Sequence, residues 1–157
     1  MQPVSSTLSL PITELVPHRS SMLLIDRLLL DEPEHVRVEA RVKRDGLFVT
    51  DDGLPAWAGV ELMAQAVATW AGLRRRENHE PVKLGFLLGT RRYECSVPFF
   101  PHGARLEIDA HKELMGENGL AVFACTISQD GRELARANLN AFSPPNVDQY
   151  LQGLLDE

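Results

Sequence analysis

The chain has 157 residues, a length that fits one domain with a hydrophobic core of useful size. Hydrophobic residues make up 44% of it and charged residues 24%, which excludes disorder as the default expectation. The net charge of −6 argues against a general nucleic-acid-binding protein, because such proteins present a basic face to phosphates.

The first half of the chain predicts two strands and one long helix. Residues 10–16 are typical of a short helical turn. A dense aliphatic run at 22–30 predicts a strand, and the apolar–polar alternation at 36–42 predicts another. A turn-rich loop at 45–55 then leads into a helix at 57–73 that is apolar on nearly all sides.

The second half of the chain predicts strands, followed by one short helix near its end. Four runs with strand character follow one another, at 83–97, 106–111, 121–127 and 133–142. Asp130 and Gly131 supply a tight hairpin turn between the last two runs. A short amphipathic helix is expected at 147–154. The alternation favours an antiparallel sheet, so we expect an α+β domain over residues 1–157, with the sheet wrapped around one central helix.

A polar stripe crosses the apolar helix. Glu61, Gln65 and Thr69 are spaced four residues apart and therefore share one helix face. These polar residues and the Ala- and Gly-rich composition favour a helix inside a globular protein over a membrane span. A carboxyl group in an apolar setting is suited to general acid chemistry. The alternative, that Glu61 and Gln65 only satisfy buried polar groups, stays open on position alone.

Three segments resemble one known family in order along the chain. Residues 15–29 (LVPHRSSMLLIDRLL) resemble the opening segment of bacterial 3-hydroxyacyl-acyl-carrier-protein dehydratases. Residues 55–66 (PAWAGVELMAQA) are similar to the central-helix motif of that family, and residues 86–109 to its third strand and the bend after it. The chain looks closest to the ApeP-like group, which is linked with aryl-polyene synthesis. The resemblance implies the hot-dog fold.

The resemblance also implies roles for individual residues. The acid on the family's helix falls on Glu61, and its backbone oxyanion contacts fall on Ala56 and Trp57. The position of the usual catalytic histidine is occupied by Leu47, which cannot accept a proton. His18 lies in the matching opening segment and is the best remaining base, although its alternative role is to fix a loop.

The other histidines carry no such expectation. Three lie in polar or exposed contexts and look like surface residues, namely His35, His79 and His111. His102 lies in a bend rich in Pro and Gly, where a structural role is expected. We expect no metal and no redox cofactor, because no cluster of ligands is evident in the sequence.

Further expectations concern the substrate and the carrier protein. An acyl tunnel is expected to include Gln65, Phe86 and Leu87, although core packing explains the last two equally well. We expect residues that contact the acidic carrier or its phosphopantetheine among five arginines: Arg74, Arg75, Arg76, Arg91 and Arg92. A solvated face and a charge match at the helix end explain them as well.

The function implied is elimination of water from 3-hydroxyacyl thioesters carried on acyl carrier protein, in fatty-acid-like or aryl-polyene synthesis. Two alternatives remain open: an acyl thioesterase in which Glu61 activates water, and a weakly active subunit that pairs with an active dehydratase. We expect a cytoplasmic protein that forms a homodimer, or a heterodimer with another hot-dog chain. The sequence does not define the acyl group.

Overall fold

In the computed structural model, the residues described are 5–16, 22–79, 86–142, 153 and 155. The helical elements are α1 (Ser5–Leu8), the 3-10 turns η1 (Ile12–Glu14) and η3 (Ala56–Ala58), and α2 (Gly59–Glu77). The long strands are β1 (Arg27–Glu32), β2 (His35–Arg41), β4 (Phe86–Cys95), β6 (Arg105–Met115), β7 (Leu120–Gln129) and β8 (Arg132–Phe142). Two short strands, β3 (Leu54–Pro55) and β5 (Phe99–Phe100), form a separate pair.

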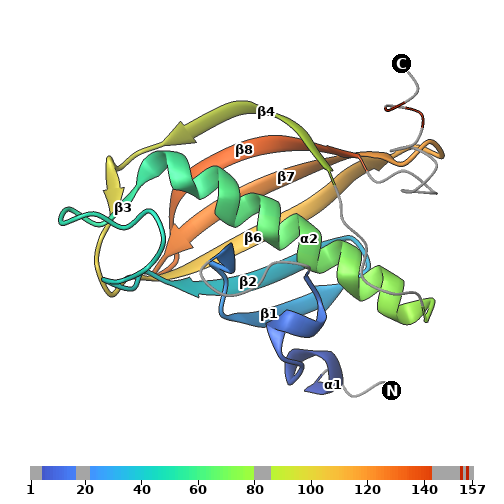
Figure 1. The fold of residues 1–157 in the computed structure, drawn as a ribbon, viewed down its shortest axis with the longest axis horizontal. Helices are drawn as coiled ribbons and strands as arrows, with labels where there is room; N and C mark the ends of the chain where they lie inside the picture. The colour runs from blue at the N-terminus through green and yellow to red at the C-terminus, as the bar shows by residue number, and fades with distance from the viewer. Residues whose placement is uncertain (1–4, 17–21, 80–85, 143–152, 154, 156–157) are drawn as a thin grey trace.

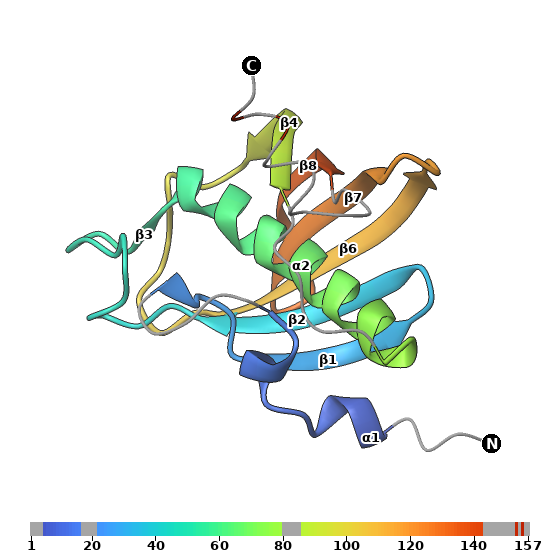
Figure 2. The ribbon, with the colours of Figure 1, turned by 45° about the vertical axis from the view of Figure 1, so that its right-hand side comes forward.

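The six long strands form one antiparallel sheet in the order β1-β2-β6-β7-β8-β4. The sheet curves around α2, which lies across its concave face (Figures 1 and 2). This arrangement confirms the hot-dog architecture expected from the sequence. β1 and β4 lie at the two ends of the sheet, so each has one edge without a partner within the described part of the chain.

Strand alternation divides the sheet into a covered face and an outer face. In the pairing of β2 with β6, Val38 lies opposite Ile108, and both are completely buried toward α2. Their neighbours along each strand point away from the helix, because successive strand residues alternate in direction. The predicted hairpin turn is also confirmed, since Asp130 (φ 51°) and Gly131 (φ 81°) both have the left-handed backbone that such a turn requires.

Helix α2 is covered by the sheet on most of its surface but not on all of it. The buried face of the helix includes Leu62, Met63, Ala66 and Leu73. Partly exposed residues remain on the other side: Val60, Glu61, Ala64, Ala68 and Ala71. The apolar composition had suggested burial on all sides, but the described part of the chain does not enclose the helix completely. No helix among the described residues combines the length and apolar character needed to cross a membrane.

Two sequence-based boundaries need comment. The first strand begins at Arg27, not at residue 22, because the backbone at Met22 and Leu24 bonds to a side chain of α2 before the strand starts. The helix expected at 147–154 falls almost wholly outside the described residues.

Helix α2 also packs closely against the N-terminal segment. Leu15, at the end of η1, is completely buried, and its carbonyl lies against Gly72 of α2. A β-carbon added to Gly72 would overlap the Leu15 carbonyl oxygen, and backbone atoms cannot easily move aside. The absence of a side chain at Gly72 therefore sets the approach of the two segments.

We predict that Gly72→Ala destabilises the protein, although alanine favours a helix more than glycine does. Overpacking typically costs about 1–3 kcal/mol, and for a chain of this size each kcal/mol lowers Tm by about 2–4 °C. Gly89→Ala on β4 is the matched control, since no atom lies within 4 Å of the added carbon there. Thermal unfolding measures both, and a Gly72→Ala variant as stable as the wild type would contradict the packing argument.

Candidate active site

The polar stripe of α2 forms a connected set of hydrogen bonds. The Gln65 side chain is completely buried, and its Nε2 donates to the Glu61 Oε1 at 3.0 Å and to the Met22 carbonyl at 2.8 Å. Its Oε1 accepts from the Leu24 amide at 2.9 Å. The Thr69 hydroxyl donates to the Gln65 carbonyl at 2.8 Å. The stripe predicted from the spacing is therefore a single network.

This network gives Gln65 a role in orienting Glu61. Both polar atoms of its side chain are used by protein partners, and none of its surface is exposed. Its expected place along an acyl tunnel stays a prediction. Glu61 is half-buried rather than enclosed, because it lies in the first turn of α2 on the stripe that the sheet leaves uncovered.

The start of the helix is held by bonds that sequence reasoning did not anticipate. The Ala56 amide donates to the Pro98 carbonyl at 3.0 Å, and its expected role as an oxyanion donor stays a prediction. The bond extends the pairing of β3 with β5 by one residue. Trp57 lies in the first turn of η3, where backbone amides have no partner within the helix, and it remains the candidate donor.

Tyr93 of β4 closes the same region from the side. Its hydroxyl donates to the Ala56 carbonyl at 2.5 Å, and it lies where a β-carbon on Gly59 would be. Burial, with a smaller contribution from nearby Cys95, raises the pKa of Tyr93, so it stays protonated and remains a donor. Tyr93 thus ties β4 to the beginning of α2. An isolated Tyr in a strand gave no sequence signal for this contact.

Leu47, the residue at the position of the family's usual histidine, is half-buried. It lines a cavity of about 220 Å³ together with Leu23, Leu24 and Leu62. Leu62 follows Glu61 directly, and Leu24 is bonded to Gln65, so the cavity adjoins the polar network. No base is supplied from this position.

Other expected site residues lie beyond what the structure describes. His18 is outside the described residues. The backbones of Phe86 and Leu87 pair with β8 at Phe142 and Ala141, but their side chains are outside the description, so their expected place in a tunnel stays a prediction. Within the described residues, one group of three potential metal ligands exists, and it lies on β2 and β6 rather than beside Glu61.

The five arginines do not form one surface. Arg74, Arg75 and Arg76 end α2, about 21 Å along the helix axis from Glu61, whereas Arg91 and Arg92 lie beside Tyr93 near its beginning. Arg74 pairs with Asp31 at 2.5 Å and lies over the face of Trp70, and its expected role in docking the carrier stays a prediction. Arg91 and Arg92 are exposed.

The chain is similar to known proteins in both sequence and fold. The family model described as ApeP dehydratase, of the ApeP-like type, matches residues 10–152. The chain belongs to the ApeP-like dehydratase family. A solved structure, the dehydratase heterocomplex ApeI:P from Xenorhabdus doucetiae, agrees with this at 35% identity and a TM-score of 0.85, covering 94% of this chain and 99% of that one.

More distant structures are similar to this ApeP-like chain in fold, and they show nothing beyond the fold. They include Cj0977, a sigma28-regulated virulence protein from Campylobacter jejuni, at 12% identity and a TM-score of 0.64 over 91% of each chain. A hypothetical thioesterase with coenzyme A from Streptococcus pneumoniae matches at 15% identity and a TM-score of 0.57, over 73% of this chain and 82% of that one. No curated protein sequence matches the chain.

We predict that Gln65→Met, which keeps the volume of the side chain, destabilises the ApeP-like fold. It leaves the Leu24 amide and the Met22 carbonyl without their side-chain partner, and an unsatisfied buried polar group typically costs about 1–3 kcal/mol. Thr69→Val is the matched control on the same stripe, because it removes only a bond to a carbonyl already in the helix. Urea unfolding compares them, and equal stabilities would show that the amide does not anchor the helix.

Proposed function

We propose that this ApeP-like protein eliminates water from 3-hydroxyacyl thioesters carried on acyl carrier protein, in the cytoplasm and in aryl-polyene or related fatty-acid-like synthesis. The observation that supports this most is the oriented carboxyl group of Glu61. It lies half-buried in the first turn of α2, held by Gln65, in a chain that belongs to a dehydratase family.

The reaction needs a base, an acid and a donor to the thioester oxygen. His18 takes the proton from C2, Glu61 gives a proton to the C3 hydroxyl, and that hydroxyl leaves as water while the C2–C3 double bond forms. The Trp57 amide, at the positive end of the α2 region, stabilises the charge that develops on the thioester oxygen. The elimination is redox-neutral, so the proposal includes no cofactor besides the phosphopantetheine of the carrier.

His18 is proposed as the base because of its place in the sequence. It lies two residues after Val16, which is completely buried, and four residues before Met22, whose carbonyl accepts from Gln65. Since Leu47 cannot take a proton, this histidine of the matching opening segment is the candidate to replace the usual one.

A second hot-dog chain is proposed to complete the site. Among the described residues β4 has an unpaired edge, Ala64, Ala68 and Ala71 of α2 are partly exposed, and Trp57 is 60% exposed. An exposed edge and a large exposed aromatic group beside the candidate acid are surfaces that a partner would cover. Because the similar Xenorhabdus protein is described as a heterocomplex, the partner is either a second copy or a different hot-dog chain that supplies a histidine.

Glu61→Gln tests the acid. The amide keeps the shape and the bond with Gln65 but has no proton to transfer, and loss of a general acid typically costs about 10²–10⁴-fold in rate. Glu77→Gln, at the exposed end of the same helix, is the matched control and keeps full activity. The assay follows dehydration of 3-hydroxyacyl carrier-protein substrates with the purified protein, alone and with a hot-dog partner. Full activity of Glu61→Gln in both conditions would remove Glu61 from the mechanism.

His18→Ala in the same assay separates a base from a loop residue. We expect a loss comparable to that of Glu61→Gln if this chain is active alone. A wild-type protein that is inactive alone but raises the activity of a partner, together with a His18→Ala variant that does the same, would assign the base to the partner and make this chain a supporting subunit.

Arg91 and Arg92 are proposed to bind the acidic carrier, because they are exposed near the start of α2 where Glu61 lies. We predict that Arg91→Glu with Arg92→Glu raises KM for carrier-bound substrate far more than KM for a short thioester mimic. Arg76→Glu is the matched control at the far end of α2, where Arg76 faces Glu14. A similar increase of KM for both substrates, or an equal effect of Arg76→Glu, would discard the docking role.

A further inference from the structure

Three potential metal ligands meet on the face of the sheet that points away from α2. His35 begins β2, and Asp109 and His111 are two residues apart on β6. The strand register places His35 directly opposite His111. Each of the three has a strand neighbour in the buried core, namely Val36, Ile108 or Ala110, so these side chains share the outer face. The arrangement is a cross-strand pair with a third ligand beside it.

The distances within this cluster are short. His35 Nε2 lies 2.6 Å from Asp109 Oδ1, and the rings of His35 and His111 are stacked with their centroids 3.7 Å apart. Potential ligand atoms of the three residues all lie within 4.8 Å of one another.

The burial of the cluster differs from what the sequence suggested. His111 is exposed, as expected, but His35 is half-buried and Asp109 is only 8% exposed although it lies on the outer face. Arg37 donates from Nε to Asp109 Oδ1 at 2.9 Å and fixes the orientation of the carboxylate. A ligand held in place by a second side chain is a common property of metal sites.

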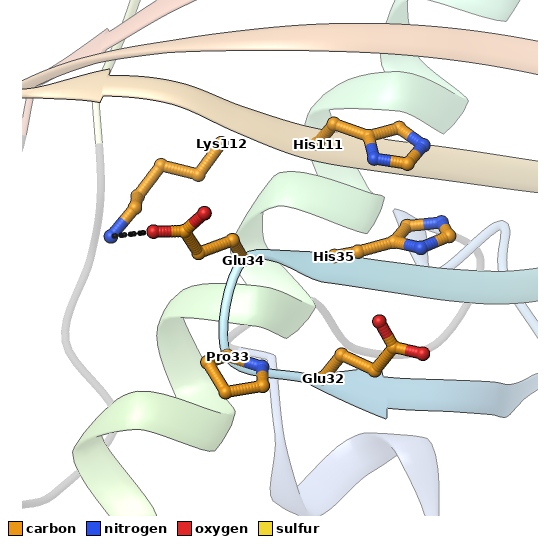
Figure 3. A pocket seen from close by; sticks show the side chains of 6 residues that line it. All are labelled: Glu32, Pro33, Glu34, His35, His111 and Lys112. Carbon is orange, nitrogen blue, oxygen red and sulfur yellow. Dashed lines mark ion pairs between the residues drawn. The ribbon is translucent and has the colours of Figure 1, made fainter.

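A cavity of about 440 Å³ adjoins the two imidazoles and is open to solvent. Figure 3 shows its lining side chains: Glu32, Pro33, Glu34, His35, His111 and Lys112. The two rings project side by side from neighbouring strands in this view. The carboxylates of Glu32 and Glu34 add negative charge beside the rings, with Lys112 paired to Glu34 at 3.9 Å. The cavity leaves room for water to complete a coordination shell.

We infer that His35, Asp109 and His111 bind a divalent transition-metal ion of the zinc type, with a fourth position open to water from the cavity. Tetrahedral zinc with ligands at about 2.0–2.1 Å needs ligand atoms about 3.4 Å apart. The separations here lie on both sides of that requirement, since one is 2.6 Å and all are within 4.8 Å. Rotation of the exposed His111 ring supplies the remaining adjustment, and the ion replaces the proton between His35 and Asp109. The site is separate from Glu61 and does not depend on the proposed dehydration.

Zinc chloride is the probe, added to the full chain prepared without a polyhistidine tag and freed of metal by a chelator. Calorimetry is expected to show one zinc ion bound per chain, and zinc is expected to raise Tm. His111→Ala is expected to weaken the affinity by at least about tenfold, because it removes a direct ligand. His79→Asn, an exposed histidine with a left-handed backbone that asparagine tolerates, is the matched control and keeps the wild-type affinity.

Asp109→Asn and Co²⁺ provide independent checks. Co²⁺ is expected to give the intense visible absorption of a tetrahedral site with the wild type and to lose it with Asp109→Asn. Circular dichroism without metal confirms that each variant folds, and His111→Ala serves alone if Asp109→Asn does not fold. No zinc binding by the wild type, or the same affinity in His111→Ala as in the wild type, would overturn the proposal.

Discussion

The buried side-chain amide of Gln65 is the constraint on which the rest of the candidate site depends. An amide with no exposed surface must have its hydrogen-bonding groups satisfied inside the protein, or the fold loses stability. Gln65 meets this requirement through the backbone of Met22 and Leu24 on one side and the carboxyl group of Glu61 on the other. One residue therefore fixes the segment that follows His18 and orients the candidate acid.

The helix that carries Gln65 is itself positioned by close backbone contacts at both of its ends. Near its beginning, Gly59 leaves space for the Tyr93 hydroxyl, which bonds to the Ala56 carbonyl. Near its other end, Gly72 leaves space for the carbonyl of Leu15. Tyr93 belongs to β4 and Leu15 follows η1, so segments far apart in the chain converge on α2. Together they leave little freedom for Glu61 to shift along or around the helix axis.

This member of the dehydratase family has Leu47 where the usual catalytic histidine is expected, so the base of the proposed reaction must come from another residue. Leu47 lines a cavity and supplies no base, while Glu61 keeps its bond with Gln65. Glu61 is one of the partly exposed residues on the side of α2 that the sheet leaves uncovered. The candidate acid thus lies where a second hot-dog chain would pack, so association and catalysis would be linked at one surface.

The sequence predicted the fold through patterns that are local. Alternation marked the strands, Asp130 and Gly131 marked a hairpin, and the run of apolar residues marked the helix, because each depends on residues close together in the chain. Glu61 was found in the same way, since a four-residue spacing places it on one face with Gln65. The family resemblance implied an acid role for Glu61 and placed the missing histidine at Leu47.

Only the tertiary structure decided which partners these residues have. The role of Gln65 depends on a segment about forty residues away, as shown by its bond to Leu24 with a separation of 41, and no local pattern encodes that contact. The Ala56 amide bonds to Pro98, and Arg74 pairs with Asp31, and both partners are distant in the chain. His35, read as a surface residue, meets Asp109 across 74 positions because strand register is set by the whole sheet.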